Sequence, residues 1–476
     1  MNKCNIIFIS FIFVLLFNMG YAGDVRFSGM GNLSLIFQDD FHKLDLYDFA
    51  GIPAGFLRND SVSFVGLRAS GLKEFWKEDS LTYLAIGQAV PRRLIDYAPV
   101  EAVSYYAVIP QFNLVPCELI YVSRQIEESY DYFGNASKPQ AWGVYAGYSH
   151  LSRDFADVEG SDVIRTPSLA IVYSKSISDN LSYGLSGDGF CGAFTSADKE
   201  DKINLTPLGA GLGMSYNNEV VSLGMNIDYH YPMFTYTHTW EGGEFKERFT
   251  GHALSPSFGS LVKFPSITWV SALDYKWVNL GGSYDGNDIG ALKIEGLAAK
   301  TQILFAPSFI RITGFVQYDY KKPVYTDNTD NIWFETAYKN YTFGGGAGVI
   351  LNIVKAGIEG LYTSVRAEDK LFEETLRSSD MSIKLGAEFG LIKDFFIRAG
   401  YNYGQFDPDL DDIIDADDCI ITNTLTSGFG INFFRNTRID LAYNYKWAKT
   451  DVDPEEQITD HIISLYLKYA LISESY

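Results

Sequence analysis

Residues 438–447 of this 476-residue chain read RIDLAYNYKW, and this short stretch decides the fold. Every second residue is apolar or aromatic, and the residues between are charged, polar or small. Because successive side chains of a β-strand point to opposite faces, a strand here has one apolar face and one polar face. The apolar face consists of Ile439, Leu441, Tyr443, Tyr445 and Trp447, and the other face of Arg438, Asp440, Ala442, Asn444 and Lys446.

The same alternation recurs from residue 140 to the end of the chain, for example over 221–231 and 381–391. About ten residues at about 3.3 Å each, tilted by about 45°, cover about 24 Å, the height of the apolar band of an outer-membrane barrel. A soluble β-sandwich would also alternate, but its strands usually stop at about 5–6 residues. The sequence therefore predicts an all-β fold, a transmembrane antiparallel β-barrel of about 16 strands within a range of about 14–20. Weaker strand candidates precede this region at 62–70, 81–90, 102–109 and 119–124.

Two further features favour a membrane barrel. Short polar or proline turns, at 178–180, 217–219, 264–266, 306–308, 393–394 and 435–437, alternate with longer acidic loops, as short periplasmic turns and long outer loops do. Strands that enter the long loops end in pairs of Tyr and Trp, which predicts a girdle at one membrane interface. The predicted girdle residues are Tyr229, Tyr231, Tyr275, Trp277, Tyr318, Tyr320, Tyr401, Tyr403, Tyr445 and Trp447.

The N-terminal residues carry an export signal. Lys3 precedes an apolar run over 6–17, and Ala22 ends the segment, so residues 1–22 are predicted to be a signal peptide. A membrane anchor would need about 20 apolar residues. Residues 23–60 show no clean alternation and are interpreted as a plug, a periplasmic extension or an irregular first strand, with 61–476 as the barrel.

Composition excludes several classes of function. The chain has 38 Lys and Arg against 59 Asp and Glu, a net charge of −21, which argues against a nucleic-acid partner. Three cysteines follow the signal, Cys117, Cys191 and Cys419, too few for a disulfide scaffold. A disulfide between Cys191 and Cys419 is possible, but unpaired thiols without a chemical role are favoured. We find no Gly-x-Ser-x-Gly or His-Glu-x-x-His motif, so no enzymatic activity and no cofactor are expected.

The polar faces of the strands predict a charged lumen. Charges of both signs face inward if the apolar positions face lipid, and burying them without water or partners would cost several kcal/mol each. The interior is therefore predicted to contain water or to pair its charges in a network of salt bridges. The predicted lumen-lining residues are Asp228, Asp274, Lys276, Arg311, Asp319, Lys355, Glu359, Lys384, Glu388, Arg398, Arg438, Asp440 and Lys446.

This lumen favours passive diffusion of small hydrophilic solutes, with the charges setting ion preference. A lumen plugged by a salt-bridge lattice is the structural alternative. A transporter for hydrophobic molecules would need apolar inward positions, of which Phe309 and Phe315 offer a little. A surface-structural or adhesive barrel that acts through its acidic loops is the third reading. The expected partners are outer-membrane lipid, the barrel-assembly machinery and small solutes.

Two local motifs carry other chemistry. Asp407, Asp409, Asp411, Asp415 and Asp418 have the ligand spacing of a calcium loop, but the sixth position is not glycine and the twelfth is not glutamate, so a solvated acidic loop is favoured. The aromatic segment 232–240 is predicted to be a loop that either stacks on a ligand or, as we favour, folds back into the barrel mouth. The glycines at 209, 211 and 213 are interpreted as marking strand bends.

The arrangement of export signal, strand hairpins and an aromatic-ended last strand resembles porin-like Gram-negative outer-membrane β-barrels over nearly the whole chain. Ile463, Leu465, Leu467 and Tyr469 look like the C-terminal signal read by the barrel-assembly machinery, from which the tail 470–476 departs. Residues 53–56 weakly resemble the Asn-Pro-Ala-Gly-Leu segment before the barrel of long-chain fatty-acid transporters, with Ile52 in place of the asparagine. The resemblance implies an outer-membrane location and a role in transport.

Overall fold

The structure is a computed structural model that describes most of the chain from residue 63 onward. The described residues are Met30, 63–76, 113–114, 117–125, 129–130, 136–154, 161–196, 200–240, 243–284, 286–371, 374–392, 394–409, 419–433, 437–450 and 457–471. Within them the regular structure is β-strand, and no helix has the length and hydropathy to cross a bilayer. The predicted signal peptide, segment 23–60 apart from the buried Met30, and the strand candidates 81–90 and 102–109 lie outside the described residues.

The strands of the first half vary in length from 2 to 16 residues. They are β1 (Ser63–Trp76), β2 (Asn113–Leu114), β3 (Cys117–Gln125), β4 (Ser129–Tyr130), β5 (Ala136–Ser137), β6 (Gln140–Asp154), β7 (Ser161–Ser176), β8 (Leu181–Phe190), β9 (Gly192–Thr195), β10 (Asp201–Leu205), β11 (Leu208–Asn217) and β12 (Val221–Tyr231).

The strands of the second half form regular long hairpins. They are β13 (Met233–Trp240), β14 (Gly243–Lys263), β15 (Ile267–Tyr284), β16 (Asn287–Phe305), β17 (Ile310–Thr326), β18 (Ile332–Ile350), β19 (Val354–Asp369), β20 (Glu374–Ile392), β21 (Phe395–Asp409), β22 (Ile420–Phe433), β23 (Thr437–Thr450) and β24 (Gln457–Leu471).

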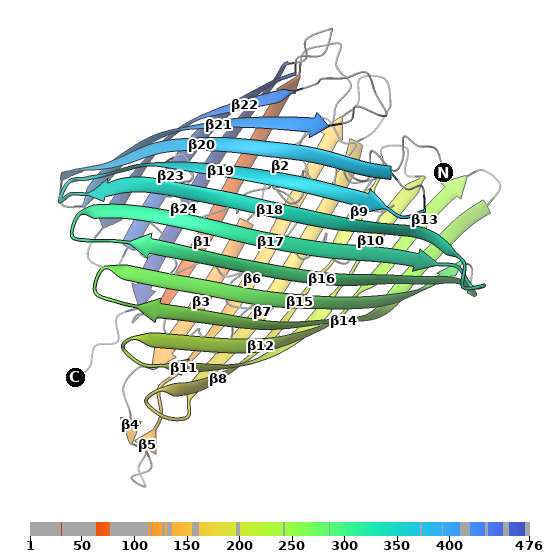
Figure 1. The fold of residues 1–476 in the computed structure, drawn as a ribbon, viewed down its shortest axis with the longest axis horizontal. Helices are drawn as coiled ribbons and strands as arrows, with labels where there is room; N and C mark the ends of the chain where they lie inside the picture. The colour runs from red at the N-terminus through yellow and green to blue at the C-terminus, as the bar shows by residue number, and fades with distance from the viewer. Residues whose placement is uncertain are drawn as a thin grey trace.

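The strands close into a ring. Apart from the small β4–β5 hairpin, all belong to one sheet of 22 segments, in which every pairing is antiparallel and, except for that of β1 with β24, joins chain neighbours or their extensions. Strand β1 pairs with β3 on one side and with β24 along its whole length on the other, from Ser63 opposite Leu471 to Trp76 opposite Ile458. Four segments (β2, β9, β10 and β13) extend β3, β8, β11 and β12, so eighteen strands close the described ring, within the predicted range. Figure 1 shows β14 to β20 on the near wall and β1, β3, β6 and β7 behind them.

Side-chain exposure confirms the predicted partition between the two faces. On β12 the apolar residues Met225 and Ile227 are 55% and 53% exposed, whereas the alternating Asn226 and Asp228 are 2% and 9% exposed. A water-soluble protein would reverse this arrangement, because exposed apolar surface is unfavourable in water. The outer surface of the barrel is therefore apolar and its interior carries the polar residues.

Four of the predicted short turns lie at one end of the ring, which we call the turn end, and connect successive strands at 177–180, 218–220, 264–266 and 306–309. A further short turn at 351–353, which was not predicted, lies at the same end, and the predicted turns at 393–394 and 435–437 lie partly outside the described residues. At the opposite end, which we call the far end, some connections are also tight, such as that between Tyr284 and Asn287. At this end the strands continue past the length needed to span the membrane. Part of the chain that was predicted to form long loops is therefore strand, and its backbone groups are hydrogen-bonded.

The prediction of a loop over 232–240 is wrong. Residues 233–240 form β13, which pairs with β14 from Met233 opposite Thr250 to Trp240 opposite Gly243, and with β10 on its other side. The aromatic residues thus extend the sheet at the far end. Phe234 does face the interior, where it is 4% exposed, so the aromatic character serves the inner wall of the barrel.

Candidate functional site: the barrel lumen

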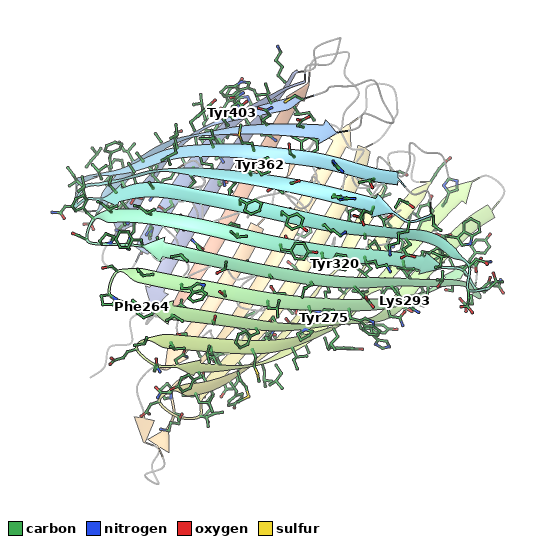
Figure 2. The ribbon with its side chains drawn as sticks, in the orientation of Figure 1. Phe264, Tyr275, Lys293, Tyr320, Tyr362 and Tyr403 are labelled. Atoms are coloured by element: carbon green, nitrogen blue, oxygen red, sulfur yellow. The ribbon has the colours of Figure 1, made fainter. Side chains whose placement is uncertain are left out.

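A belt of aromatic residues marks the outer surface. Figure 2 shows Tyr275, Tyr320 and Tyr403 in a band across the strands, with Phe264 nearer the turn end and Lys293 nearer the far end. Tyr229, Tyr275 and Trp277 are the most exposed of the predicted girdle, at 36–43%. The other seven, Tyr231, Tyr318, Tyr320, Tyr401, Tyr403, Tyr445 and Trp447, are partly exposed.

The structure adds Tyr341 and Tyr362 to this belt, at 43% and 46% exposed. Tyr341 lies opposite Tyr318 in the register of β17 and β18, and their ring centroids are 5.0 Å apart. Only strands entering the long loops were expected to carry girdle residues, whereas Tyr341 lies on a strand returning from the far end. The alternation of the segment 341–349 was the signal that could have revealed it.

Charged residues form a network on the inner wall near the turn end. The Arg398 side chain is fully buried, and its Nε donates to Glu388 Oε2 at 2.8 Å. Its Nη2 lies 2.7 Å from Asp440 Oδ1, and Arg438 Nε donates to Asp440 Oδ2 at 2.6 Å. Gly430, between the strands of Arg398 and Asp440, leaves the space these groups need, since a Cβ there would lie 2.5 Å from both side chains. These four predicted lumen residues therefore act as one unit.

The other predicted lumen residues occupy inward positions by the same alternation. Glu359 is fully buried and lies opposite Lys384 in register, and Asp319 accepts a hydrogen bond from Gln317 at 2.6 Å. Lys276, Arg311, Lys355, Lys384 and Lys446 are half-buried, Asp228 is buried and Asp274 is exposed. The inner wall thus carries charges of both signs along several strands.

A second polar cluster covers the glycines of β11. His230 Nε2 lies 3.3 Å from Asp188 Oδ2, and Asn226 donates to Asp228 at 2.7 Å. A Cβ at position 209 would lie 2.2 Å from the His230 ring, and one at position 211 would lie 2.3 Å from Asp228 Oδ1. Strand β11 pairs without a register shift on both sides, so these glycines make room for neighbouring side chains rather than marking bends.

The inner wall toward the far end is apolar. Phe249 is 7% exposed, and its ring centroid lies 6.2 Å from that of Phe234 and 6.4 Å from that of Tyr325. The Phe249 ring lies over β15, where a Cβ at Gly282 would come within 2.6 Å of it. Further buried apolar residues on this wall are Phe194, Ile203, Leu205, Val278, Leu280, Leu292 and Ile294. We call this set, together with Phe234, Phe249 and Tyr325, the apolar inner wall.

Sequence reasoning missed this wall. Of the two apolar residues named for a hydrophobic conduit, Phe315 faces inward and is half-buried, but Phe309 lies in a turn and is 49% exposed. The wall combines residues from β9, β10 and β13 to β17, and the alternation on each strand contributes only one or two of them. The sequence signal for this wall was the alternation that places residues 278, 280, 292 and 294 on the inward face of their strands.

The described residues contain no group of three or more His, Cys, Asp or Glu that could hold a metal ion. Asp407 and Asp409 lie on β21, whereas Asp411, Asp415 and Asp418 lie outside the described residues, so the calcium loop stays a prediction. Cys191 and Cys419 are free thiols, as favoured over a disulfide between them.

No protein-family model matches the chain, and no curated protein is similar to it in sequence. Several solved structures are similar in shape. A CymD monoaromatic hydrocarbon channel matches 96% of this chain and 99% of its own, with 11% identity and a TM-score of 0.40. The toluene transporter TodX of Pseudomonas putida matches 93% and 96%, with 10% identity and a TM-score of 0.35. The ferric citrate transporter FecA matches 86% and 80%, with 8% identity and a TM-score of 0.45.

The classification of this chain rests on its own geometry. A ring of antiparallel strands leaves no open sheet edge, which is the condition for β-structure to cross lipid. Its outer face carries exposed apolar residues and an aromatic belt, and its inner face carries buried charges. This chain is an outer-membrane β-barrel.

Proposed function

We propose that the barrel takes up small molecules with a substantial apolar part, which enter at the far end along the apolar inner wall. In outer-membrane barrels the short turns face the periplasm, so the far end opens to the outside. The single observation that carries the proposal is the axial division of the lumen. Apolar residues line the inner wall toward the far end, and the Arg398 network lies toward the turn end.

The composition of the apolar inner wall suits a ligand site. Binding sites for small molecules are mostly apolar and aromatic, with a few polar groups that fix orientation. Phe234, Phe249 and Tyr325 bring three rings together, and Tyr325 Oη donates to the Ile289 carbonyl at 2.8 Å. That hydrogen bond holds the Tyr325 ring in place, in a T-shaped contact with Phe249. A ligand with an aromatic or aliphatic body would gain from contact with these rings.

Passive diffusion of small hydrophilic solutes is the second candidate. The charges near the turn end favour it, because rings of charged side chains set ion preference in water-filled pores. The two candidates differ in which half of the lumen controls passage. An apolar substrate depends on the residues near Phe249, whereas an ion depends on the partly exposed lumen charges near the turn end, such as Arg311 and Lys355.

The test compares binding and conductance on the refolded barrel. The hydrophobic fluorophore N-phenyl-1-naphthylamine should bind the detergent-solubilised protein saturably, and Phe249→Ser should weaken its binding about tenfold or more, since burying an aromatic ring is worth at least about 1.5 kcal/mol. The matched control is Phe258→Ser on the outer face of the same strand, where Phe258 is 47% exposed. Equal binding by wild type and Phe249→Ser, together with stable ohmic conductance in planar bilayers, would favour the hydrophilic channel instead.

A further inference from the structure

Three cations lie side by side on the outer face of the barrel. Lys339 on β18 is opposite Arg366 on β19, and Arg366 is opposite Arg377 on β20, so the three positions form one line across neighbouring strands. Arg366 and Arg377 are exposed, and Lys339 is partly exposed. We call these three residues the cation row. Like charges directly opposite one another on antiparallel strands are destabilising, so the row needs compensation.

The row lies just beyond the aromatic belt. Lys339 lies two residues nearer the far end than Tyr341 on β18, and Arg366 lies four residues nearer the far end than Tyr362 on β19. At about 3.3 Å per residue and a tilt of about 45°, these steps correspond to about 5–9 Å along the membrane normal. The aromatic belt lies at the level of the interface, so the cation row lies at the level of lipid headgroups.

Protein carboxylates compensate the row only in part. Glu368 Oε1 forms ion pairs with Lys339 Nζ at 2.9 Å and with Arg366 Nε at 3.0 Å, so one carboxylate compensates two cations. Asp409 is the residue opposite Arg377 in the register of β20 and β21. Next to the row, Glu335 likewise serves both Lys322 at 2.8 Å and Lys370 at 3.3 Å.

Within the row, two of the three cations share the single carboxylate of Glu368. The other exposed acidic residues nearby lie beside other positions, with Glu295 opposite Lys322 and Asp407 opposite Ser379. Arg366 and Arg377 are therefore two exposed arginines, directly opposite each other, that one anion at headgroup level can contact together.

We propose that the cation row binds the phosphate groups of a phosphorylated lipid in the outer leaflet. Arginine guanidinium groups match phosphate oxygens with paired hydrogen bonds, and two arginines opposite each other can share one phosphate. An anion at this point also removes the repulsion between Arg366 and Arg377. The acyl chains of the same lipid lie along the exposed apolar residues of the belt, such as Phe343 and Tyr362.

The experiment measures retained lipid. The full-length barrel in dodecyl maltoside is incubated with bis-phosphorylated lipid A, separated from free lipid by size exclusion, and assayed for bound phosphorus. The double variant Arg366→Gln/Arg377→Gln is expected to bind about 30-fold more weakly, because each basic residue near an anionic lipid surface contributes about a factor of five. The control is Lys263→Gln, an exposed cation at the turn end of β14, which should bind as wild type does.

Other arms separate the alternatives. Lipid A without phosphates should be retained poorly by wild type and by both variants alike. Inorganic phosphate at millimolar concentration should not displace the lipid, and complete displacement would point to a free-phosphate site and overturn the assignment to a lipid. Equal retention of bis-phosphorylated lipid A by wild type and the double variant would overturn the proposal, as would an equal loss in Lys263→Gln.

A stability measurement distinguishes lipid binding by Arg366 and Arg377 from a purely structural role of these two residues. In lipid-free detergent the double variant should unfold at the same temperature as wild type or higher, because it relieves the repulsion within the row. With bis-phosphorylated lipid A present, wild type should gain more thermal stability than the double variant, since a ligand that binds only the folded state stabilises it. A double variant that is less stable than wild type without lipid, and gains as much from lipid, would refute the inference.

Discussion

The Arg398 network offers the sharpest test of how the lumen is built. Arg398 has no exposed side-chain surface, and its partners Glu388 and Asp440 are 3% and 1% exposed. Replacing Arg398 by Met keeps a side chain of similar length but leaves two buried carboxylates without this cation. Removing one partner of a buried ion pair typically costs about 3–5 kcal/mol. We expect Arg398→Met to lower the free energy of unfolding by that amount, because Arg438 still compensates Asp440 but lies on β23, away from Glu388.

The assay is reversible urea unfolding of the barrel in phosphatidylcholine vesicles, followed by tryptophan fluorescence and extrapolated to zero denaturant. The control is Arg438→Met, whose side chain is 31% exposed and whose loss should cost about 1 kcal/mol or less. Adding Glu388→Gln to Arg398→Met should recover part of the lost stability, since it removes an uncompensated buried charge. A loss below about 1 kcal/mol in Arg398→Met, or simple additivity of the two changes, would refute the buried network and indicate that lumen water screens these charges.

Three further predictions follow from local geometry. Gly251→Ala should destabilise the barrel by about 1–3 kcal/mol in the same unfolding assay, because a Cβ there would lie 1.9 Å from the Asn279 carbonyl oxygen. Gly259→Ala, where the nearest atom to a Cβ is 3.9 Å away, should be nearly neutral, and equal effects of the two variants would contradict this. Hydrogen bonds from Trp333 above all, and then from Thr329 and Asn331, hold the pKa of Asp327 well below its usual range. The turn that these residues form is therefore stabilised above about pH 3.9 and loosens as the pH falls further. Hydrogen exchange of the Thr329 and Asn331 amides, corrected for intrinsic rates, should show this loosening, and Asp327→Asn should abolish the pH dependence. In variants that retain one tryptophan each, brominated lipid should quench Trp269, on the outer face near the turn end, and Trp277, on the belt, but not Trp333 beyond the belt. Quenching of Trp333 alone would invert the proposed membrane position.

Local alternation was sufficient to predict which side chains face lipid. On the strand over 381–391, Met381, Ile383 and Leu385 are 38–43% exposed, and the alternating Glu388 is buried. This worked because a closed barrel gives each strand two fixed environments, so a period of two in the sequence translates directly into position. The predicted girdle relied on the same rule and overlooked Tyr341, because the expectation considered strands running in one direction only.

Long-range pairing explains the differences between prediction and structure. The segment 233–240 alternates aromatic or His residues with threonine, a strand signal that the loop prediction did not use, and β10 and β14 pair with its two edges. The glycines of β11 are interpreted correctly only when β8 and β12 place Asp188, Asp228 and His230 above them. In both cases the deciding contacts come from paired neighbouring strands, so they depend on the register between segments.

The sequence by itself determined that this chain is a β-barrel with an apolar exterior, because that conclusion depends on the period of two along single strands. It also determined that charged residues face inward, since they alternate with the lipid-facing residues. Only the tertiary structure decided what those inward residues do. The Arg398 network, the apolar inner wall and the cation row each join side chains from several strands, and their contacts depend on the register between strands, a property of paired segments that no single segment encodes.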